Sequence, residues 1–199
     1  KINSKSIWAQ RLSFVGELGY ELYIQPNEAN EIYKLIVEKG KKFKLSHCGM
    51  HALDTMRMES GFLHWGHDIS PEENQYQAGL SFAVSFKKDV EFIGKQALEK
   101  IRKEKVTRRF AMLILKNSKP GNPLLLHEEP IFLDDVIIGR TTSGNYSFNY
   151  NKNLSFGYIS TSLSNEELQN KKLYIEIEKK KYEANILLKP LKNTKFKVI

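Results

Sequence analysis

The amino-acid sequence predicts an α+β protein in which an α+β segment precedes a small antiparallel barrel. Up to about residue 105, strand-like runs alternate with segments of helical periodicity. From residue 107, short strand-like runs are separated by Gly, Pro, Asn and Ser clusters, with no long helix. Several short strands at that spacing are typical of a small barrel or sandwich. We therefore expect domains at 1–88 and 107–199, joined by a connector helix within 89–106.

The first segment is expected to contain both strands and helices. Asn27 is a good N-cap for a helix that ends near Gly40, and Gly61 is a plausible stop for a second one. The expected elements are strands at 7–15 and 20–25 around a Gly-rich turn at 16–19, helices at 27–40 and 49–60, a polar loop, a strand at 80–86 and a basic helix at 94–105. Met50, Leu53, Met56 and Arg57 are expected on the packed side of the second helix.

The second segment is expected to be all-β. Its apolar runs are short and are bounded by turn-forming residues, which is the pattern of antiparallel strands joined by tight connections. The expected strands are at 108–115, 130–133, 136–142, 154–160, 173–178 and 181–188. We expect these six strands to close into a barrel-like domain.

The net charge of +8 over 199 residues indicates either an anionic partner or a solvated, Lys-rich surface. Lysines cluster at several places, the last of them at 189–197, but Lys far exceeds Arg and no repeated aromatic pattern interleaves with the basic runs. These observations argue against a nucleic-acid partner and leave a Lys-rich surface or an anionic small-molecule ligand. No apolar run approaches the ~20 residues that span a bilayer, so no membrane partner is expected.

The single cysteine, Cys48, excludes an internal disulfide framework and fits a reducing, cytoplasmic location without a secretory leader. We expect it to be a buried structural residue, since free Cys usually packs as a small hydrophobe. His47 and His51 lie close to it in sequence, but a zinc site needs further ligands that the sequence does not supply. A Cys48–His51 dyad lacks an orienting third group, and no phosphate loop, dinucleotide fingerprint or nucleophile elbow is present. We expect no metal.

The run VGELGYELYI at 15–24 carries two carboxylates in an otherwise strand-like stretch. Gly16 and Gly19 predict a turn, which leaves Glu17 exposed at the bend. Glu21 is then the second residue of the next strand and shares a face with Tyr23. A carboxylate at this position either lies in solvent or accepts hydrogen bonds from a planar group that has two parallel donors.

The order of segments resembles the folate-binding aminomethyltransferase family, which includes the glycine cleavage system T protein. The resemblance rests on SFVGELGYELYI (13–24), GMHALDTMRMESGFLHWGHDI (49–69), NQYQAGLSFAV (74–84), EFIGKQAL (91–98) and IGRTTSGNYSFNYNKNLSFGYI (138–159). It is nearest to the C-terminal folate-binding part of dimethylglycine and sarcosine dehydrogenases. It implies a partial folate-binding α+β domain followed by the barrel-like domain, and tetrahydrofolate, with or without a polyglutamate tail, as the ligand.

The resemblance also implies which residues hold the pterin. Glu21 matches the family's glutamate, whose carboxylate accepts two parallel pterin N–H donors. Phe14 stands where the dehydrogenase-type members have a tyrosine, and Phe62 matches an aromatic position near the pterin. Arg57 and Glu59 match positions that we interpret as structural salt-bridge partners. The sequence departs from the family at Leu53, where the cleavage enzymes have an arginine, and at Gln75 and Gln77.

The family's catalytic aspartate lies upstream of the region matched here, so we expect no catalytic residue in this chain and an inactive fragment when it is alone. The implied function is one-carbon (aminomethyl or methyl) transfer that forms 5,10-methylenetetrahydrofolate, completed by a missing N-terminal domain. Any FAD is expected only on an upstream domain. The alternative is a non-catalytic folate-binding or scaffold module of a larger oxidoreductase.

Overall fold

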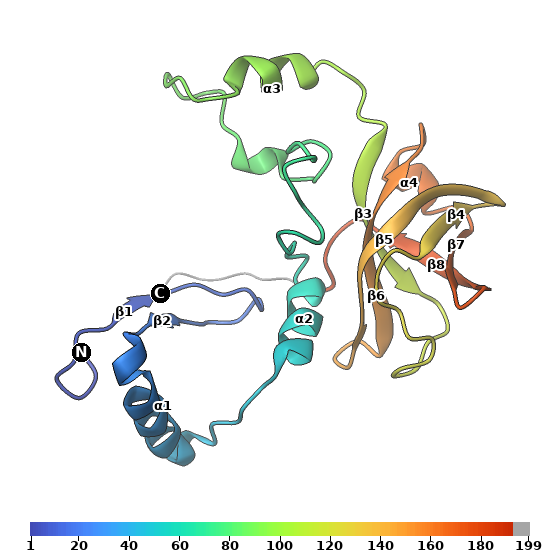
Figure 1. The fold of residues 1–199 in the computed structure, drawn as a ribbon. Coiled ribbons are helices and arrows are strands. Elements are labelled where there is room, and N and C mark those ends of the chain that lie inside the picture. The colour runs from blue at the N-terminus through green and yellow to red at the C-terminus, as the bar shows by residue number, and fades with distance from the viewer. Residues whose placement is uncertain (193–199) are drawn as a thin grey trace.

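The structure of the chain is a computed structural model that describes residues 1–192. The end of the expected barrel domain, 193–199, and the lysines beyond residue 192 lie outside the described residues. Figure 1 shows the barrel on one side, α2 against it, and a hairpin with one helix extending away from it. No helix within residues 1–192 combines the length and apolarity needed to cross a membrane.

The second half is a closed antiparallel barrel, as the sequence predicts (Figure 1). The strand order around it is β3-β6-β5-β4-β7-β8. The strands are β3 (Arg108–Leu115), β4 (Pro130–Leu133), β5 (Val136–Ser147), β6 (Lys152–Ser160), β7 (Leu173–Ile177) and β8 (Lys180–Leu187). Alternate residues fill the interior, among them Leu113, Ile131 and Ile175, which are fully buried. The α+β architecture with a barrel is therefore confirmed.

Strand β5 runs to Ser147 rather than ending at residue 142 as expected. Gly144 and Asn145 have the composition of a turn, but both continue the ladder with β6, opposite Ser155 and Leu154. A register shift between Thr141 and Ser143 kinks the strand at this point. The longer strand matters because its last residues form one wall of a cavity.

The short helix α4 (Asn165–Leu168) contributes to the barrel core. Ser164 accepts from the Glu167 amide while the Glu167 side chain accepts from the Ser164 amide, which is a complete capping box. The cap fixes one turn of helix so that Leu168 is fully buried in the core cluster.

The first half contains a two-stranded hairpin and two principal helices. Strands β1 (Trp8–Gln10) and β2 (Glu21–Tyr23) pair antiparallel, with Gln10 opposite Glu21. Each strand has three residues and is shorter than expected. The other elements are α1 (Pro26–Gly40), the 3-10 turn η1 (Lys41–Phe43), α2 (Met50–Glu59), η2 (Ser81–Ala83) and α3 (Lys95–Ile101). Gln25, not Asn27, is the N-cap of α1, because Pro26 already lies in the first turn.

Three expectations for this half are wrong. The run 80–86 forms η2 instead of a strand, because its backbone bonds are local, from Ala83 to Leu80 and from Val84 to Ser81. Cys48 is exposed, since the segment that joins η1 to α2 has no described layer over it. The third expectation is wrong in part: Arg57 lies on the packed side of α2 as expected, together with Thr55, Met58 and Glu59, but Met50 is exposed, because the helix packs on β5 and β6 through its C-terminal turns.

An ion pair joins the polar loop after α2 to the barrel. Arg108 on β3 donates to Glu73 over 2.9 Å, and its guanidinium lies 4.2 Å from the centroid of the Tyr158 ring. Burial raises the pKa of the Glu73 carboxyl, but hydrogen bonds from Ser70 and Arg108 outweigh burial and hold the pKa below its ordinary value of 4.5. Ionised Glu73 therefore stabilises the folded state.

We expect the stabilisation from Glu73 to be present above about pH 4.5 and to be lost as the pH falls through the lower folded-state pKa. Urea unfolding of the wild type and Glu73→Gln should differ at pH 7, and the difference should shrink steadily below pH 4.5. Glu72→Gln, one residue away and exposed, is the control and should show no such trend. A difference that is constant from pH 7 to pH 3 would contradict the assignment.

Candidate functional site

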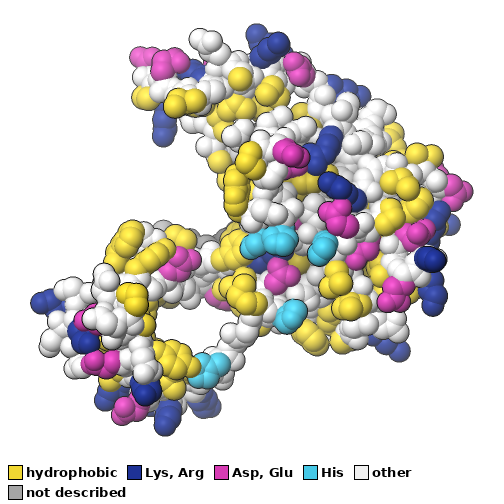
Figure 2. All heavy atoms as spheres, in the orientation of Figure 1, with side chains coloured by type: hydrophobic (Ala, Val, Ile, Leu, Met, Phe, Trp, Pro, Cys, Tyr) yellow, Lys and Arg dark blue, Asp and Glu magenta, His cyan; other side chains and the backbone are white. Residues whose placement is uncertain are grey.

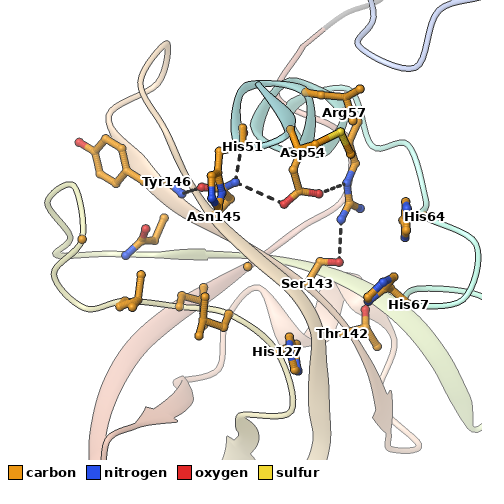
Figure 3. A pocket seen from close by; sticks show the side chains of 18 of the residues that line it. His51, Asp54, Arg57, His64, His67, His127, Thr142, Ser143, Asn145 and Tyr146 are labelled. Atoms are coloured by element: carbon orange, nitrogen blue, oxygen red, sulfur yellow. Dashed lines mark hydrogen bonds and ion pairs between the residues drawn. The ribbon is translucent and has the colours of Figure 1, made fainter. Parts of the chain in front are cut away.

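A cavity of about 470 Å³ lies between the two halves of the described chain. Its walls come from α2, the 64–67 turn, the 120–127 loop and the end of β5 (Figure 3). The volume is in the range of small-molecule sites. Leu53, where the cleavage enzymes are expected to have an arginine, is one of the lining residues.

The buried guanidinium of Arg57 organises the floor of this cavity. Its Nε donates to Asp54 over 2.7 Å, and Nη2 donates to the Ser143 hydroxyl over 2.7 Å (Figure 3). Its Nη1 donates to Asp68 over 2.5 Å and to the Phe62 carbonyl over 3.1 Å. The interpretation of Arg57 as a structural ion-pair residue agrees with this geometry, in which every nitrogen of the group is engaged.

Asp68 is the fully buried acceptor beneath the cavity, at 1% exposure. Besides Arg57, it accepts from the Thr142 hydroxyl over 2.6 Å, the Ser143 hydroxyl over 2.8 Å and the His64 amide over 2.9 Å. Such a carboxylate is held in place because three of its four donors lie on α2 and β5. It fixes the 61–69 loop against β5. Asp68 stands within the run 49–69 that carries the resemblance, but no pattern in that run assigns it a role.

Glu59 is the last residue of α2 and is also fully buried. It accepts from the Ser147 hydroxyl over 2.5 Å and from the Asn149 amide over 2.8 Å. Within residues 1–192 it forms no ion pair, so the expected salt bridge is replaced by neutral donors from the end of β5 and the turn after it. Its role remains structural.

Four of the chain's five histidines line the cavity. They come from three separate segments, which are α2, the loop after it and the loop before β4, and they are His51, His64, His67 and His127 (Figure 3). Figure 2 shows histidine side chains gathered in the hollow between the N-terminal part and the barrel. Within the described part of the chain, no three His, Cys, Asp or Glu side chains are placed to hold a metal ion.

Two of the three predicted pterin residues come together. The rings of Phe14 and Phe62 stack with centroids 6.3 Å apart and planes 20° apart. Phe14 also contacts the His64 ring at 6.2 Å, and His64 contacts His67 at 4.6 Å. A continuous row of flat rings therefore leads from Phe62 and Phe14 to the edge of the cavity.

The third predicted residue, Glu21, lies apart from that row on the exposed face of the hairpin. As the strand alternation predicts, it shares a face with Tyr23, whose hydroxyl donates to it over 2.8 Å. This hydrogen bond raises the pKa of the Tyr23 hydroxyl. Glu21 is not a lining residue of the cavity or of a second, shallow one of about 180 Å³ near Leu18. Glu17, expected in solvent, is more than half exposed but pairs with Lys192.

The two halves of the chain match two family models in the same order. Residues 1–88 match the GCVT N-terminal domain, and residues 108–192 match the glycine cleavage T-protein C-terminal barrel domain. An α+β segment that packs one helix on a closed six-stranded barrel agrees with this pairing of domains. The chain belongs to the glycine cleavage T-protein family.

Relatives with this pairing include larger oxidoreductases. Dimethylglycine dehydrogenase of Rattus norvegicus is 33% identical over 96% of this chain and 22% of that protein, and sarcosine dehydrogenase of Mus musculus is 34% identical over 76% and 16%. An aminomethyltransferase of Halothermothrix orenii is 34% identical over 79% of this chain and 43% of that protein. The chain thus spans about a fifth of the length of the dimethylglycine dehydrogenases it matches.

A solved structure supports the fold. The glycine cleavage system aminomethyltransferase T from Bartonella henselae aligns with a TM-score of 0.75 and 22% identity. The alignment covers 92% of this chain and 49% of the other. The likeness therefore extends through both halves of the chain.

Proposed function

We propose that this chain is the tetrahydrofolate-binding part of an enzyme that transfers a one-carbon unit to tetrahydrofolate and so forms 5,10-methylenetetrahydrofolate. The observation that carries the proposal is the stacked pair Phe14 and Phe62. These two aromatic positions, which the resemblance assigns to the pterin, are distant in sequence and meet beside His64, which lines a cavity of ligand size.

Glu21 is the proposed anchor of the pterin edge. Its carboxylate has about four lone-pair sites, so the hydrogen bond from Tyr23 leaves both oxygens able to accept from a ligand. Tyr23 also restricts the carboxylate to one orientation, which lowers the entropy lost on binding. Phe14 and Phe62 would supply the flat apolar surface against which the ring packs.

A further part of the same protein is the proposed partner of the hairpin. A two-stranded hairpin is marginally stable alone, and this one exposes large apolar side chains, among them Trp8, Leu18 and Tyr20. We propose that a preceding domain covers this surface and supplies the catalytic acid or base, so that no residue of this chain is catalytic and the chain alone is inactive. Any FAD would belong to such a preceding domain, and a cytoplasmic location is proposed for the whole protein.

The anchor role is tested by tetrahydrofolate binding to the full-length protein, measured by anaerobic titration calorimetry. Loss of a charge-assisted, two-point hydrogen bond should weaken binding about thirtyfold in Glu21→Ala. Glu17→Gln is the matched control, because Glu17 lies in the same hairpin, in the turn before β2, and pairs with Lys192 instead. Undiminished binding by Glu21→Ala would refute the anchor role. If the intact protein binds tetrahydrofolate but transfers no one-carbon unit to it, the chain is a non-catalytic folate-binding module.

A further inference from the structure

We propose that a bulge in strand β5 at Thr142 positions the aromatic side chains that receive the pterin ring. At this bulge, the hydroxyls of Thr142 and Ser143 hold the 61–69 loop, which carries Phe62, against the barrel. This inference rests on the proposed function, since it takes Phe14 and Phe62 as the surface on which the ring packs. It adds two positioning residues that lie on the barrel and act on that surface through a buried network.

The bulge gives β5 one residue more than its partner strand. Thr141 lies opposite Gly157, while Ser143 lies opposite Phe156, the neighbouring residue of β6. Thr142 therefore has no partner of its own in the described ladder. Side chains along a regular strand point alternately to the two faces of a sheet. An extra residue interrupts this alternation and re-aims the side chains beside it.

Two neighbouring hydroxyls of β5 consequently reach one carboxylate. Thr142 donates to Oδ1 of Asp68 over 2.6 Å, and Ser143 donates to the same oxygen over 2.8 Å. Both residues lie at the wall of the cavity (Figure 3). Thr141, just before the bulge, is bonded to Glu129 instead. The bulge therefore directs both hydroxyls toward the loop that follows α2.

The network carries these contacts to the backbone of the ring-bearing loop. Oδ2 of Asp68 accepts from the His64 amide over 2.9 Å. Arg57, which pairs with Asp68, donates to the Phe62 carbonyl over 3.1 Å. The backbone is thus held at Phe62 and again at His64, and these are the two residues of the loop whose rings contact Phe14.

Burial makes the geometry of this network strict. Arg57 is 2% exposed and Asp68 is 1% exposed, so water does not replace a lost partner. Phe14 and Phe62 come from separate segments, and their stacking at 6.3 Å depends on where the loop is held. A loop released from β5 would present its ring in several positions, and a ligand that packs on it would lose more entropy on binding.

Tetrahydrofolate binding to the full-length protein tests this role, with Thr142→Val as the variant. Valine keeps the branched shape without the hydroxyl, and three donors to Asp68 remain, so the variant should fold. We expect about fivefold weaker binding, because part of the strength of a hydrogen bond to a charged group is lost at the ring site. Thr142→Ser restores the hydroxyl and should bind within about twofold of the wild type.

Ser147→Ala is the matched control. Ser147 lies on the same strand and donates to the buried Glu59 carboxylate, which holds the end of α2 rather than the 61–69 loop. Its loss should lower the free energy of unfolding but change the affinity by less than about twofold. Amide exchange adds a measurement without ligand: the His64 amide should exchange about tenfold faster in Thr142→Val and at the wild-type rate in the control.

Combination with Phe62→Ala separates positioning from direct contact, because Thr142 also lines the cavity. A residue that acts through the ring has little left to act on when the ring is removed. Thr142→Val should therefore weaken binding by less than about twofold in the Phe62→Ala background. An undiminished loss in that background would mean that the hydroxyl meets the ligand itself, and would refute the positioning role.

The outcomes distinguish this inference from the proposed function. If the wild type binds tetrahydrofolate and Thr142→Val binds it equally well, or if Ser147→Ala loses as much affinity as Thr142→Val, the positioning role is refuted while the proposed function stands. If the wild type does not bind tetrahydrofolate, the proposed function fails and the positioning role fails with it.

Discussion

Replacing Asp68 by Ala should lower the free energy of unfolding by about 3–5 kcal/mol, because the substitution leaves the Arg57 guanidinium buried without its principal partner. Three further donors also lose their acceptor, namely the Thr142 and Ser143 hydroxyls and the His64 amide. An unsatisfied buried donor costs about 1–3 kcal/mol, although losses within one network do not add. The expected change is a large fraction of the stability of an ordinary domain.

Equilibrium urea unfolding measures this loss, and Asp54→Ala is the matched control. Asp54 also pairs with Arg57, but its side chain is 35% exposed, so water can replace it and the loss should be about 1 kcal/mol. In a double-mutant cycle, Arg57→Met with Asp68→Ala should be more stable than the sum of the single changes predicts, since the unpaired charge is gone. Equal losses for Asp54→Ala and Asp68→Ala would show that burial does not decide the energy of this network.

The barrel could be predicted from the sequence because the patterns that indicate its strands and turns lie within short stretches of the chain. Alternation of apolar and polar residues and the turn residues between runs place five of the six strands within about two residues of their observed ends. Strand β5 is the exception. Gly144 and Asn145 favour a turn in isolation, but pairing with β6 satisfies their backbone groups and continues the strand.

The cavity could not be predicted, because its residues come from segments whose approach depends on tertiary packing. The resemblance named Phe14 and Phe62 one by one, and only the structure shows their contact. The histidines stand in a helix and two loops, with no spacing that links them. Sequence patterns report the period of an element and not the distance between elements, so they assign no role to Asp68.

The position of β5 against β6 depends on Gly139, and Gly139→Ala should destabilise the barrel by about 3 kcal/mol. A Cβ built there would lie 1.9 Å from the Tyr158 carbonyl oxygen and 3.0 Å from the Ile159 Cα. Both atoms are backbone, and in a closed barrel neither strand can move away without breaking its bonds to the next. Relief of the clash therefore has to come from opening the β5–β6 ladder.

Urea unfolding of three variants tests this constraint. Gly157→Ala tests the same pair of strands from β6, where the added Cβ would lie 2.4 Å from the Arg140 carbonyl oxygen, and should lose a similar amount. Gly49→Ala is the control, because no atom lies within 4 Å of its Cβ and only the change of N-cap residue remains, at about 1 kcal/mol or less. Since β5 also carries Ser143 and Asn145 to the cavity, a shift of this strand should weaken the proposed folate binding as well. If Gly139→Ala matched the control in both measurements, β5 and β6 would not be held at the separation on which the cavity wall depends.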